Sequence, residues 1–217
     1  MKEYHKIPTV FKRDPDTNFK TLLENQFAEP ELEYLQRNKW IFTEKVDGTN
    51  IRIIFNNRLN IGGELAFGGK TDNAQIPAFL LNKLNDLFFP LKSQLAEMFN
   101  DGVCLYGEGY GAKIQKGGGN YRQDQSIVIF DIKIGEWWLQ RKDIEDITKT
   151  LNLEIIPIIG EGTLYDMISM AKKGFKSRWG DFRAEGIVAR PTIELKARNG
   201  KRIITKIKYK DFENEIS

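Results

Sequence analysis

The sequence contains one cysteine, Cys104, and one histidine, His5, among its 217 residues. A single cysteine excludes a disulfide bond within the chain, and one His with one Cys cannot form a zinc site of the usual His and Cys ligands. Any chemistry in this chain therefore has to use lysine, arginine, aspartate and glutamate.

Long apolar runs are also missing. No window approaches the roughly 18 uninterrupted apolar residues of a membrane span, and the N-terminal MKEYHKIPTV has no apolar segment of signal-peptide length. We therefore expect a soluble chain with no membrane partner in a reducing, cytoplasmic setting.

The excess of one charge sign is small, because 33 Lys and Arg face 30 Asp and Glu, for a net charge of +3. A nucleic-acid partner therefore has to be argued from local clusters of charge. With 41% hydrophobic and 12% aromatic residues, the chain is long enough for one sizeable core. We expect a single domain over residues 1–217, without a linker and without an appended C-terminal domain.

Runs rich in β-branched and aromatic residues predict strands. WIFTEKV and NIRIIF, between Trp40 and Phe55, flank the tripeptide DGT and predict a hairpin with a tight Asp-Gly turn. Four later runs predict further strands: VCLYGEGYG, SIVIFDIKI, EGIVARP and RIITKIKY.

Apolar residues at helical spacing alternate with these runs. They predict helices around Glu29–Arg37, in two pieces over Pro77–Phe99 that break at Pro90, and over Arg141–Leu151 and Thr163–Lys173. The remaining residues of 2–38 are polar, and the glycine-rich stretch 109–122 predicts one mobile loop.

Charged residues recur in or beside the apolar strands. Lys45 and Asp47 are two residues apart, so an extended strand places them on one side. The same spacing puts Lys206 and Lys208 on one face, where they could bind a polyanion such as a triphosphate. Buried charges are costly unless they are paired or bound to ions, so this recurrence needs a cause.

Two carboxylates in these strands, Glu108 and Glu185, could supply the oxygen ligands that Mg²⁺ prefers. Asp131 lies in a third strand. A lysine, two further lysines, two carboxylates and a metal ion together indicate a phosphoryl-transfer site.

At this point the sequence resembles a known family. In order, KVDGTN, YGEG, IFDI, EGIVARP and KIK look like motifs I, III, IIIa, IV and V of the covalent nucleotidyltransferases, which include ATP-dependent RNA and DNA ligases and mRNA-capping enzymes. Five motifs in register over about residues 40–210 are far more specific than one short pattern. Glu44 before the lysine and Asn50 after DGT resemble the RNA ligases, especially the RNA-repair type found in phage.

The resemblance implies a role for each matching residue. Lys45 would attack the α-phosphate of ATP and hold AMP as a phosphoramidate, with Glu44 and Asn50 contacting the nucleotide. Phe130 would stack on adenine. The other implied roles are Glu108 at the ribose or a metal-bound water, Glu185 at magnesium, Lys206 and Lys208 at the phosphates, and Asp47 and Asp131 as supporting site residues.

The chain departs from the family in two respects. The arginine that contacts the ribose or the RNA terminus has Lys70 as its nearest match, with Arg52 as the competing candidate, and lysine cannot form arginine's two-pronged contact. Full-length ligases also commonly add a C-terminal domain, so we expect a minimal ligase or a core that needs a partner protein.

The resemblance thus implies an α+β fold, in which antiparallel sheets form a nucleotide-binding cleft with flanking helices, as in a ligase adenylyltransferase or ATP-grasp-like core. It implies an ATP-dependent RNA ligase that uses ATP as co-substrate with Mg²⁺. Its substrate would be RNA, as a nicked duplex or single-stranded ends, with DNA as a second candidate. The setting would be a bacterial cytoplasm, or the host cytoplasm for a phage-encoded chain.

Other interpretations stay open at the sequence level. Within the superfamily they are a DNA ligase or a GTP-using capping enzyme, and outside it a non-catalytic RNA-binding accessory subunit. Lys113–Arg122, with three cations and Tyr121, could grip an RNA backbone and stack a base, or could be an exposed loop. Residues 11–14 could approach phosphate, although a plain surface role is favoured.

Overall fold

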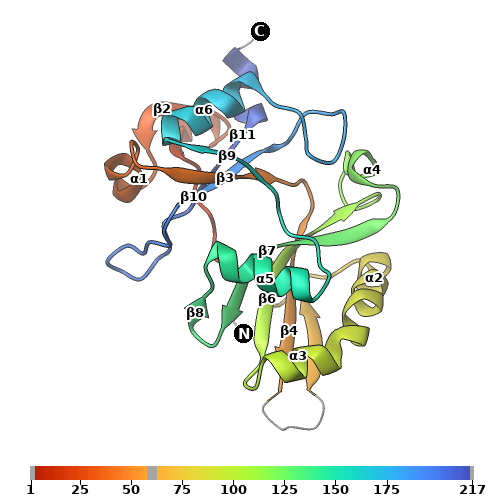
Figure 1. Ribbon diagram of the computed structural model, residues 1–217. Helices are drawn as coiled ribbons and strands as arrows, with labels where there is room; N and C mark the ends of the chain where they lie inside the picture. The colour runs from red at the N-terminus through yellow and green to blue at the C-terminus, as the bar shows by residue number, and fades with distance from the viewer. Residues whose placement is uncertain (1–2, 58–62, 216–217) are drawn as a thin grey trace. The chain divides into compact units, whose positions relative to one another are not determined.

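The computed structural model describes residues 3–57 and 63–215, and it has a mixed α+β fold in which the sheets are antiparallel (Figure 1). The expected α+β class with antiparallel sheets is therefore confirmed. The chain divides into two compact units. Unit 1 consists of Met1–His5 and Asp47–Ile156, and unit 2 of Lys6–Val46 and Pro157–Ser217.

The elements follow the chain in a mixed order. The strands are β1 (Phe11–Arg13), β2 (Leu22–Phe27), β3 (Trp40–Lys45), β4 (Thr49–Asn56), β5 (Glu64–Gly68), β6 (Val103–Gly111), β7 (Gln125–Ile134), β8 (Trp137–Trp138), β9 (Ile158–Gly162), β10 (Gly186–Pro191) and β11 (Thr205–Lys208). The helices are η1 (Pro15–Thr17), α1 (Pro30–Tyr34), α2 (Ala78–Phe88), η2 (Phe89–Leu91), α3 (Lys92–Met98), α4 (Gly118–Tyr121), α5 (Arg141–Thr150), α6 (Leu164–Lys173) and η3 (Tyr209–Glu215).

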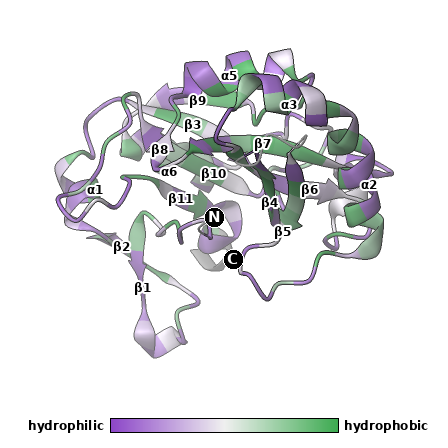
Figure 2. Cartoon of the chain, turned by 90° about the horizontal axis from the view of Figure 1, so that it is seen from below, coloured by the Kyte–Doolittle hydropathy of each residue, from purple (hydrophilic) through white to green (hydrophobic). Residues whose placement is uncertain are grey.

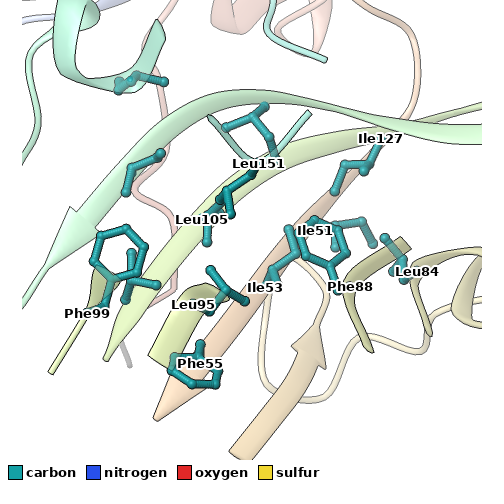
Figure 3. Close-up of a cluster of buried hydrophobic side chains, with 14 of the residues drawn as sticks. Ile51, Ile53, Phe55, Leu84, Phe88, Leu95, Phe99, Leu105, Ile127 and Leu151 are labelled. Atoms are coloured by element: carbon teal, nitrogen blue, oxygen red, sulfur yellow. The ribbon is translucent and has the colours of Figure 1, made fainter. Parts of the chain in front are cut away.

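Unit 1 is built on a five-stranded sheet in the order β5-β4-β6-β7-β8. One face of this sheet packs against α2, α3 and α5, and the buried side chains between them form the core of the unit (Figure 3). Strand β7 is largely hydrophobic, while α5 carries both hydrophilic and hydrophobic residues (Figure 2). The core members from the strands are Ile51, Ile53, Phe55, Val103, Leu105, Ile127, Ile129 and Ile132.

A β-bulge in β7 shifts the alternation of this strand. Tyr106 of β6 is opposite Asp131, but the next residue, Gly107, is opposite Ile129, so Phe130 is an extra residue in the ladder. Ile129 before the bulge and Ile132 after it both lie in the core. A bulge re-aims side chains in this way, and here it leaves Phe130 and Asp131 off the helix-covered face.

Unit 2 contains a four-stranded sheet in the order β11-β10-β3-β9 and a separate pair, β1-β2. Side chains from alternate positions of β3, such as Trp40 and Phe42, join Leu164 and Met167 of α6 in the core. Helix α6 begins with a capping box between Thr163 and Asp166, which satisfies backbone N–H groups of its first turn. In the part of the chain that the structure describes, the apolar core of this sheet lies on the face that packs against α6.

The predicted hairpin between β3 and β4 is wrong. β3 pairs with β10 and β9, whereas β4 pairs with β5 and β6 in the other unit. Gly48 is not among the glycines with positive φ. A Cβ built on it would lie 2.3 Å from the carbonyl oxygen of Gly109, so the glycine permits close approach to β6 rather than a tight turn.

Other segments differ from the predictions in detail. Residues 2–38 contain the strands β1 and β2 as well as α1, which ends at Tyr34 instead of Arg37. Residues 109–122 are not one open loop, since β6 continues to Gly111 and α4 follows. Strands β5, β8 and β9 were not predicted; each is short and carries exposed residues.

The other predicted helices are present, whereas the short helices η1, α4 and η3 were not predicted. The helical region after Pro77 is divided into α2 and α3 by η2, which contains Pro90, and α5 and α6 lie within one residue of their predicted bounds. In the described part of the chain, no helix is both long and apolar enough to cross a membrane. The expectation of one domain over residues 1–217 stays a prediction.

We predict that Gly48→Ala lowers the free energy of unfolding by about 1–3 kcal/mol, because the added methyl group would overlap backbone atoms of β6. Urea unfolding of the wild type and variant measures this loss. Gly119→Ala is the control, since a Cβ there meets no atom within 4 Å. Equal stability of Gly48→Ala and the wild type would contradict the close approach.

Candidate active site

Three residues of unit 2 meet across its sheet on the face that does not carry the core. Gly186 of β10 lies opposite Lys45 of β3 on one side and opposite Lys208 of β11 on the other. Lys45 and Lys208 therefore flank the same point of the central strand. Lys206 is two residues before Lys208 and shares its face, as the sequence predicts, while Ile207 between them points into the core.

Glu185, immediately before Gly186, forms an ion pair with both lysines. Its Oε2 lies 2.6 Å from Lys45 Nζ, and its Oε1 lies 2.5 Å from Lys208 Nζ. The three side chains are 13–23% exposed, so these are partly buried, charge-assisted hydrogen bonds rather than loose surface contacts. Two ammonium groups thus share one carboxylate, which leaves one positive charge in excess.

Glycine at position 186 makes this arrangement possible. A Cβ there would lie 2.2 Å from the carbonyl oxygen of Ile207 and 2.7 Å from the Cα of Lys208. A larger residue would push β11 away from β10 and separate Glu185 from Lys208. The pattern EG before an apolar strand is therefore a geometric requirement of the ion-pair cluster.

Glu44 lies on the other face of β3 from Lys45 and is 1% exposed. Its carboxylate accepts hydrogen bonds from Ser177 Oγ at 2.6 Å and from the backbone N–H of Arg178 at 2.8 Å. Burial raises the pKa of Glu44, although these two hydrogen bonds oppose the shift. In this arrangement Glu44 fixes the loop after α6, and its implied contact with a nucleotide stays a prediction.

Five further predicted residues share the face of the unit 1 sheet that lies opposite the core. Strand alternation, with the bulge in β7, places them on the side opposite the core. The five residues are Asn50, Arg52, Glu108, Phe130 and Asp131. The sequence motifs that contain them are far apart in the chain, and the sheet brings them together.

Asn50 and Glu108 are direct neighbours in the β4–β6 ladder. The Asn50 Oδ1 atom is buried and has no hydrogen-bond partner within the part of the chain that the structure describes. A buried acceptor without a donor is costly. Asn50 therefore presents an oxygen atom suited to a bound metal ion, a water molecule or a ligand donor.

Phe130 and Asp131 are held by a residue that the sequence analysis missed. Tyr4 donates a hydrogen bond from its hydroxyl to Asp131 Oδ2 at 2.7 Å. The Tyr4 ring also meets the Phe130 ring edge to face, with centroids 5.0 Å apart. Tyr4 and Asp131 are 127 positions apart, and no local pattern links them.

The structure separates the two candidates for the missing arginine. Arg52 is 2% exposed, donates from Nε to the carbonyl of Gly69 at 2.9 Å and pairs with Asp72 at 2.8 Å. It therefore braces the segment after β5. Lys70, inside that segment, is exposed, so it is the better placed of the two to meet a ligand.

The segment after Lys45 is fixed within unit 1 by the glycine-rich residues 109–122. The backbone N–H of Asp47 donates to the Tyr121 hydroxyl at 3.1 Å, and Gln115 Nε2 donates to the carbonyl of Gly48 at 3.0 Å. Tyr121 is 8% exposed. The hypothesis that Tyr121 stacks a base is therefore wrong, because its ring is buried and its hydroxyl holds Asp47.

The N-terminal residues 11–14 have structural contacts. Phe11 is buried in the core of unit 2, and Arg13 pairs with Asp211 at 2.6 Å. Among the described residues, no three His, Cys, Asp or Glu side chains are grouped so that they could hold a metal ion. A metal ion held by one or two carboxylates with phosphate and water, as is usual for Mg²⁺, does not need such a group.

We predict that Arg52→Ala lowers the free energy of unfolding by roughly 2–3 kcal/mol. The change leaves the Gly69 carbonyl without the hydrogen bond from Arg52, and it leaves the buried space of the arginine side chain empty. Lys70→Ala should change the free energy of unfolding by less than about 0.5 kcal/mol, since the side chain is exposed. Chemical unfolding of both variants tests the assignment, and comparable losses in the two would overturn it.

We predict that the stability difference between Glu44→Gln and the wild type depends on pH. Because the folded-state pKa of Glu44 is raised above its ordinary value of 4.5, folding retains a proton that the unfolded chain has lost. Wild-type stability should therefore fall relative to Glu44→Gln as the pH rises from 4.5 through the raised pKa. Unfolding curves from pH 4 to about 8 measure the trend. Glu33→Gln, at an exposed position, is the control, and a trend of opposite sign would contradict the burial effect.

Comparison with known proteins tests the resemblance seen in the sequence. Residues 38–209 match the family model described as RNA ligase. No curated protein sequence matches the chain. The range matched by the family model, residues 38–209, includes every motif from KVDGTN to KIK.

Solved structures of Naegleria gruberi RNA ligase share the fold. The structure with PPi is 17% identical with a TM-score of 0.66, and the match covers 98% of this chain and 59% of that one. A mutant in the apo state is 18% identical with a TM-score of 0.65, and the match covers 98% of this chain and 60% of that one. Another mutant, with ATP and Mn, is 18% identical with a TM-score of 0.64, and the match covers 95% of this chain and 56% of that one. This chain thus spans about 60% of their length.

The family match extends over more than half of the chain and includes the sheet residues that carry the paired lysines and glutamate. The resemblance seen in the sequence is therefore confirmed, and the chain belongs to the RNA ligase family.

Proposed function

We propose that the chain is an ATP-dependent RNA ligase in which Lys45 becomes covalently adenylylated, and that it joins 5′-phosphate and 3′-hydroxyl ends. The observation that carries this proposal is the cluster in which Glu185 pairs with both Lys45 and Lys208. ATP, PPi and Mn in the Naegleria gruberi structures support the choice of nucleotide, leaving group and divalent metal.

The first step forms a phosphorus–nitrogen bond. The amine of Lys45 attacks the α-phosphorus of ATP, the bond from that phosphorus to the bridging oxygen breaks, and pyrophosphate leaves with the electron pair. Only a neutral amine can attack, so the proton that Lys45 shares with Glu185 has to leave first. Glu185, 2.6 Å away, is placed to receive it.

Lys206 and Lys208 then bind the phosphates of ATP. They lie on the same face of β11, and Lys208 already binds a carboxylate, which offers the same kind of oxygen acceptor as a phosphate. When a triphosphate replaces the carboxylate as partner, the two ammonium groups neutralise the charge that builds up on the departing pyrophosphate.

Two more displacements complete the reaction. An oxygen of the RNA 5′-phosphate attacks the phosphorus of lysyl-AMP, and the Lys45 nitrogen leaves and takes up a proton. The 3′-hydroxyl of the other end then attacks the activated 5′-phosphorus, loses its proton to solvent, and AMP leaves. Positioning and charge neutralisation supply most of the catalysis in such transfers.

The donor set of unit 1 fits a magnesium ion. Glu108 and Asn50 offer neighbouring oxygen atoms, and Asn50 Oδ1 is buried without a donor from the described residues. When bound there, Mg²⁺ would neutralise phosphate charge. Glu185 fits less simply, since both its oxygens are paired with lysines. Its role as a metal ligand requires one of these ion pairs to open.

Phe130 and Asp131 complete the proposed nucleotide contacts. The bulge in β7 places both off the core face, and Tyr4 holds them. In this assignment Phe130 stacks on the adenine and Asp131 is the support that positions it, with Lys70 as the exposed cation nearest in sequence to the family's arginine.

We predict that the protein acquires label from ATP labelled at the α-phosphate in the presence of magnesium, and that the label survives denaturation. Lys45→Ala and Lys45→Arg should both remain unlabelled. Lys45→Arg keeps a cation for Glu185 but has no usable nucleophile, so it separates the chemical role of Lys45 from its ion pair.

Three results would contradict parts of the proposal. Label that persists in Lys45→Arg would remove Lys45 as the nucleophile, and label from GTP in preference to ATP would favour a capping enzyme. No label in the wild type would favour a non-catalytic RNA-binding protein. Sealing assays with nicked RNA and nicked DNA then decide between the two ligases.

A further inference from the structure

Unit 2 contains a groove that the proposed chemistry does not use. The groove has a volume of about 440 Å³ and lies between α1 and the segment 192–204, which we term the arm. In Figure 1 the arm is the blue loop that leaves β10 on the side of α1. A volume of this size is within the roughly 300–1,000 Å³ of small-ligand sites.

The arm forms a fixed wall of this groove. The Arg202 guanidinium binds the Glu194 carboxylate across the arm, and Arg202 is only 3% exposed. The backbone N–H of Ala197 donates to the carbonyl of Lys201 at 2.7 Å, and Gly200 supplies the positive φ of the turn at 82°. Lys201 ties the arm to Glu29, next to α1, at 2.5 Å. The groove is therefore present before any ligand binds.

The cations of the arm fall into two pairs with different partners. Lys201 and Arg202 are neutralised by glutamates, as described above. Lys196 and Arg198 line the groove, are exposed, and take part in no ion pair with any residue that the structure describes. Their charge outweighs that of Glu31, the acidic residue of the same lining. The groove thus offers two cations to an anionic ligand.

The facing wall offers an aromatic ring. Tyr34, at the end of α1, is 86% exposed, although the groove beside it is lined by apolar Leu195 and Ile203. An exposed ring at a partly apolar groove that also carries two unpaired cations combines a stacking surface with phosphate contacts. This combination is typical of sites for single-stranded nucleic acid.

We propose that the groove binds a nucleotide of single-stranded RNA, with its base stacked on Tyr34 and adjacent phosphates at Lys196 and Arg198. The inference rests on the proposed function, because it assigns this strand to the RNA that the ligase joins. An acidic peptide could satisfy the cations, but it does not need the flat face of an exposed tyrosine.

The test measures binding of a short fluorescein-labelled oligouridylate by fluorescence anisotropy at several salt concentrations. Tyr34→Ala should weaken binding roughly 5- to 100-fold, whereas Tyr34→Phe, which retains the ring, should bind like the wild type. The double variant Lys196→Ala/Arg198→Ala should lower the slope of log affinity against log salt by about 1.4, since each single-strand phosphate contact contributes about 0.7.

A matched double variant controls for net charge. Lys142→Ala/Lys149→Ala removes two exposed cations from α5 in unit 1, and it should reduce the salt slope much less. If the groove variants and this control bind RNA alike, the inference is wrong. Absence of any RNA binding by the wild type, or stronger binding of an acidic peptide than of RNA at the same groove, would also overturn it.

Labelling from ATP distinguishes this failure from failure of the proposed function. Tyr34→Ala and the Lys196/Arg198 double variant should acquire label at the wild-type rate when no RNA is present, because neither change touches Lys45 or its ion pairs. A wild type that acquires label but binds RNA without the groove refutes the groove alone. A wild type that acquires no label refutes the enzyme.

Discussion

The ion-pair cluster around Glu185 is the contact that sets the strictest requirement on the strand register of unit 2. Bringing two ammonium groups to one partly buried carboxylate costs desolvation energy, and the attraction offsets that cost only if the geometry is tight. Three strands must therefore hold their register, with Gly186 in the middle to let β11 approach. The buried residues of β3, β10 and β11, packed against α6, keep that register and so keep Lys45 in place.

The motifs predicted most of the candidate site. Charged residues inside apolar strands are rare enough that Lys45, Glu108, Glu185, Lys206 and Lys208 could be selected from the sequence, and strand alternation correctly placed Lys206 and Lys208 together. Prediction from the sequence failed for contacts between residues that are far apart in the chain. Tyr4 reaches Asp131 and Ser177 reaches Glu44 across more than a hundred positions, and periodicity within one segment carries no information about such partners.

The secondary structure likewise contains features that the sequence predicted and features that it did not. Long amphipathic helices and long apolar strands were predicted nearly to their ends, because burial dominates their energetics. DGT was misinterpreted as a turn, since an Asp-Gly pair has the same composition whether its glycine adopts positive φ or admits a neighbouring strand. Gly48 does the latter. Tyr121, likewise, was placed on a surface because its neighbours are glycines, although its own hydroxyl binds Asp47.

The division of the chain into two units affects the order in which its parts can fold during synthesis. Residues 47–156 of unit 1 form a continuous stretch between the two parts of unit 2. Synthesis proceeds from the N-terminus, and a segment can fold once its partners have been made. Strand β3 is released early, but the carboxylate that pairs with Lys45 follows 140 residues later. Lys45 is thus translated long before Glu185, and its final environment can form only after that residue has been made.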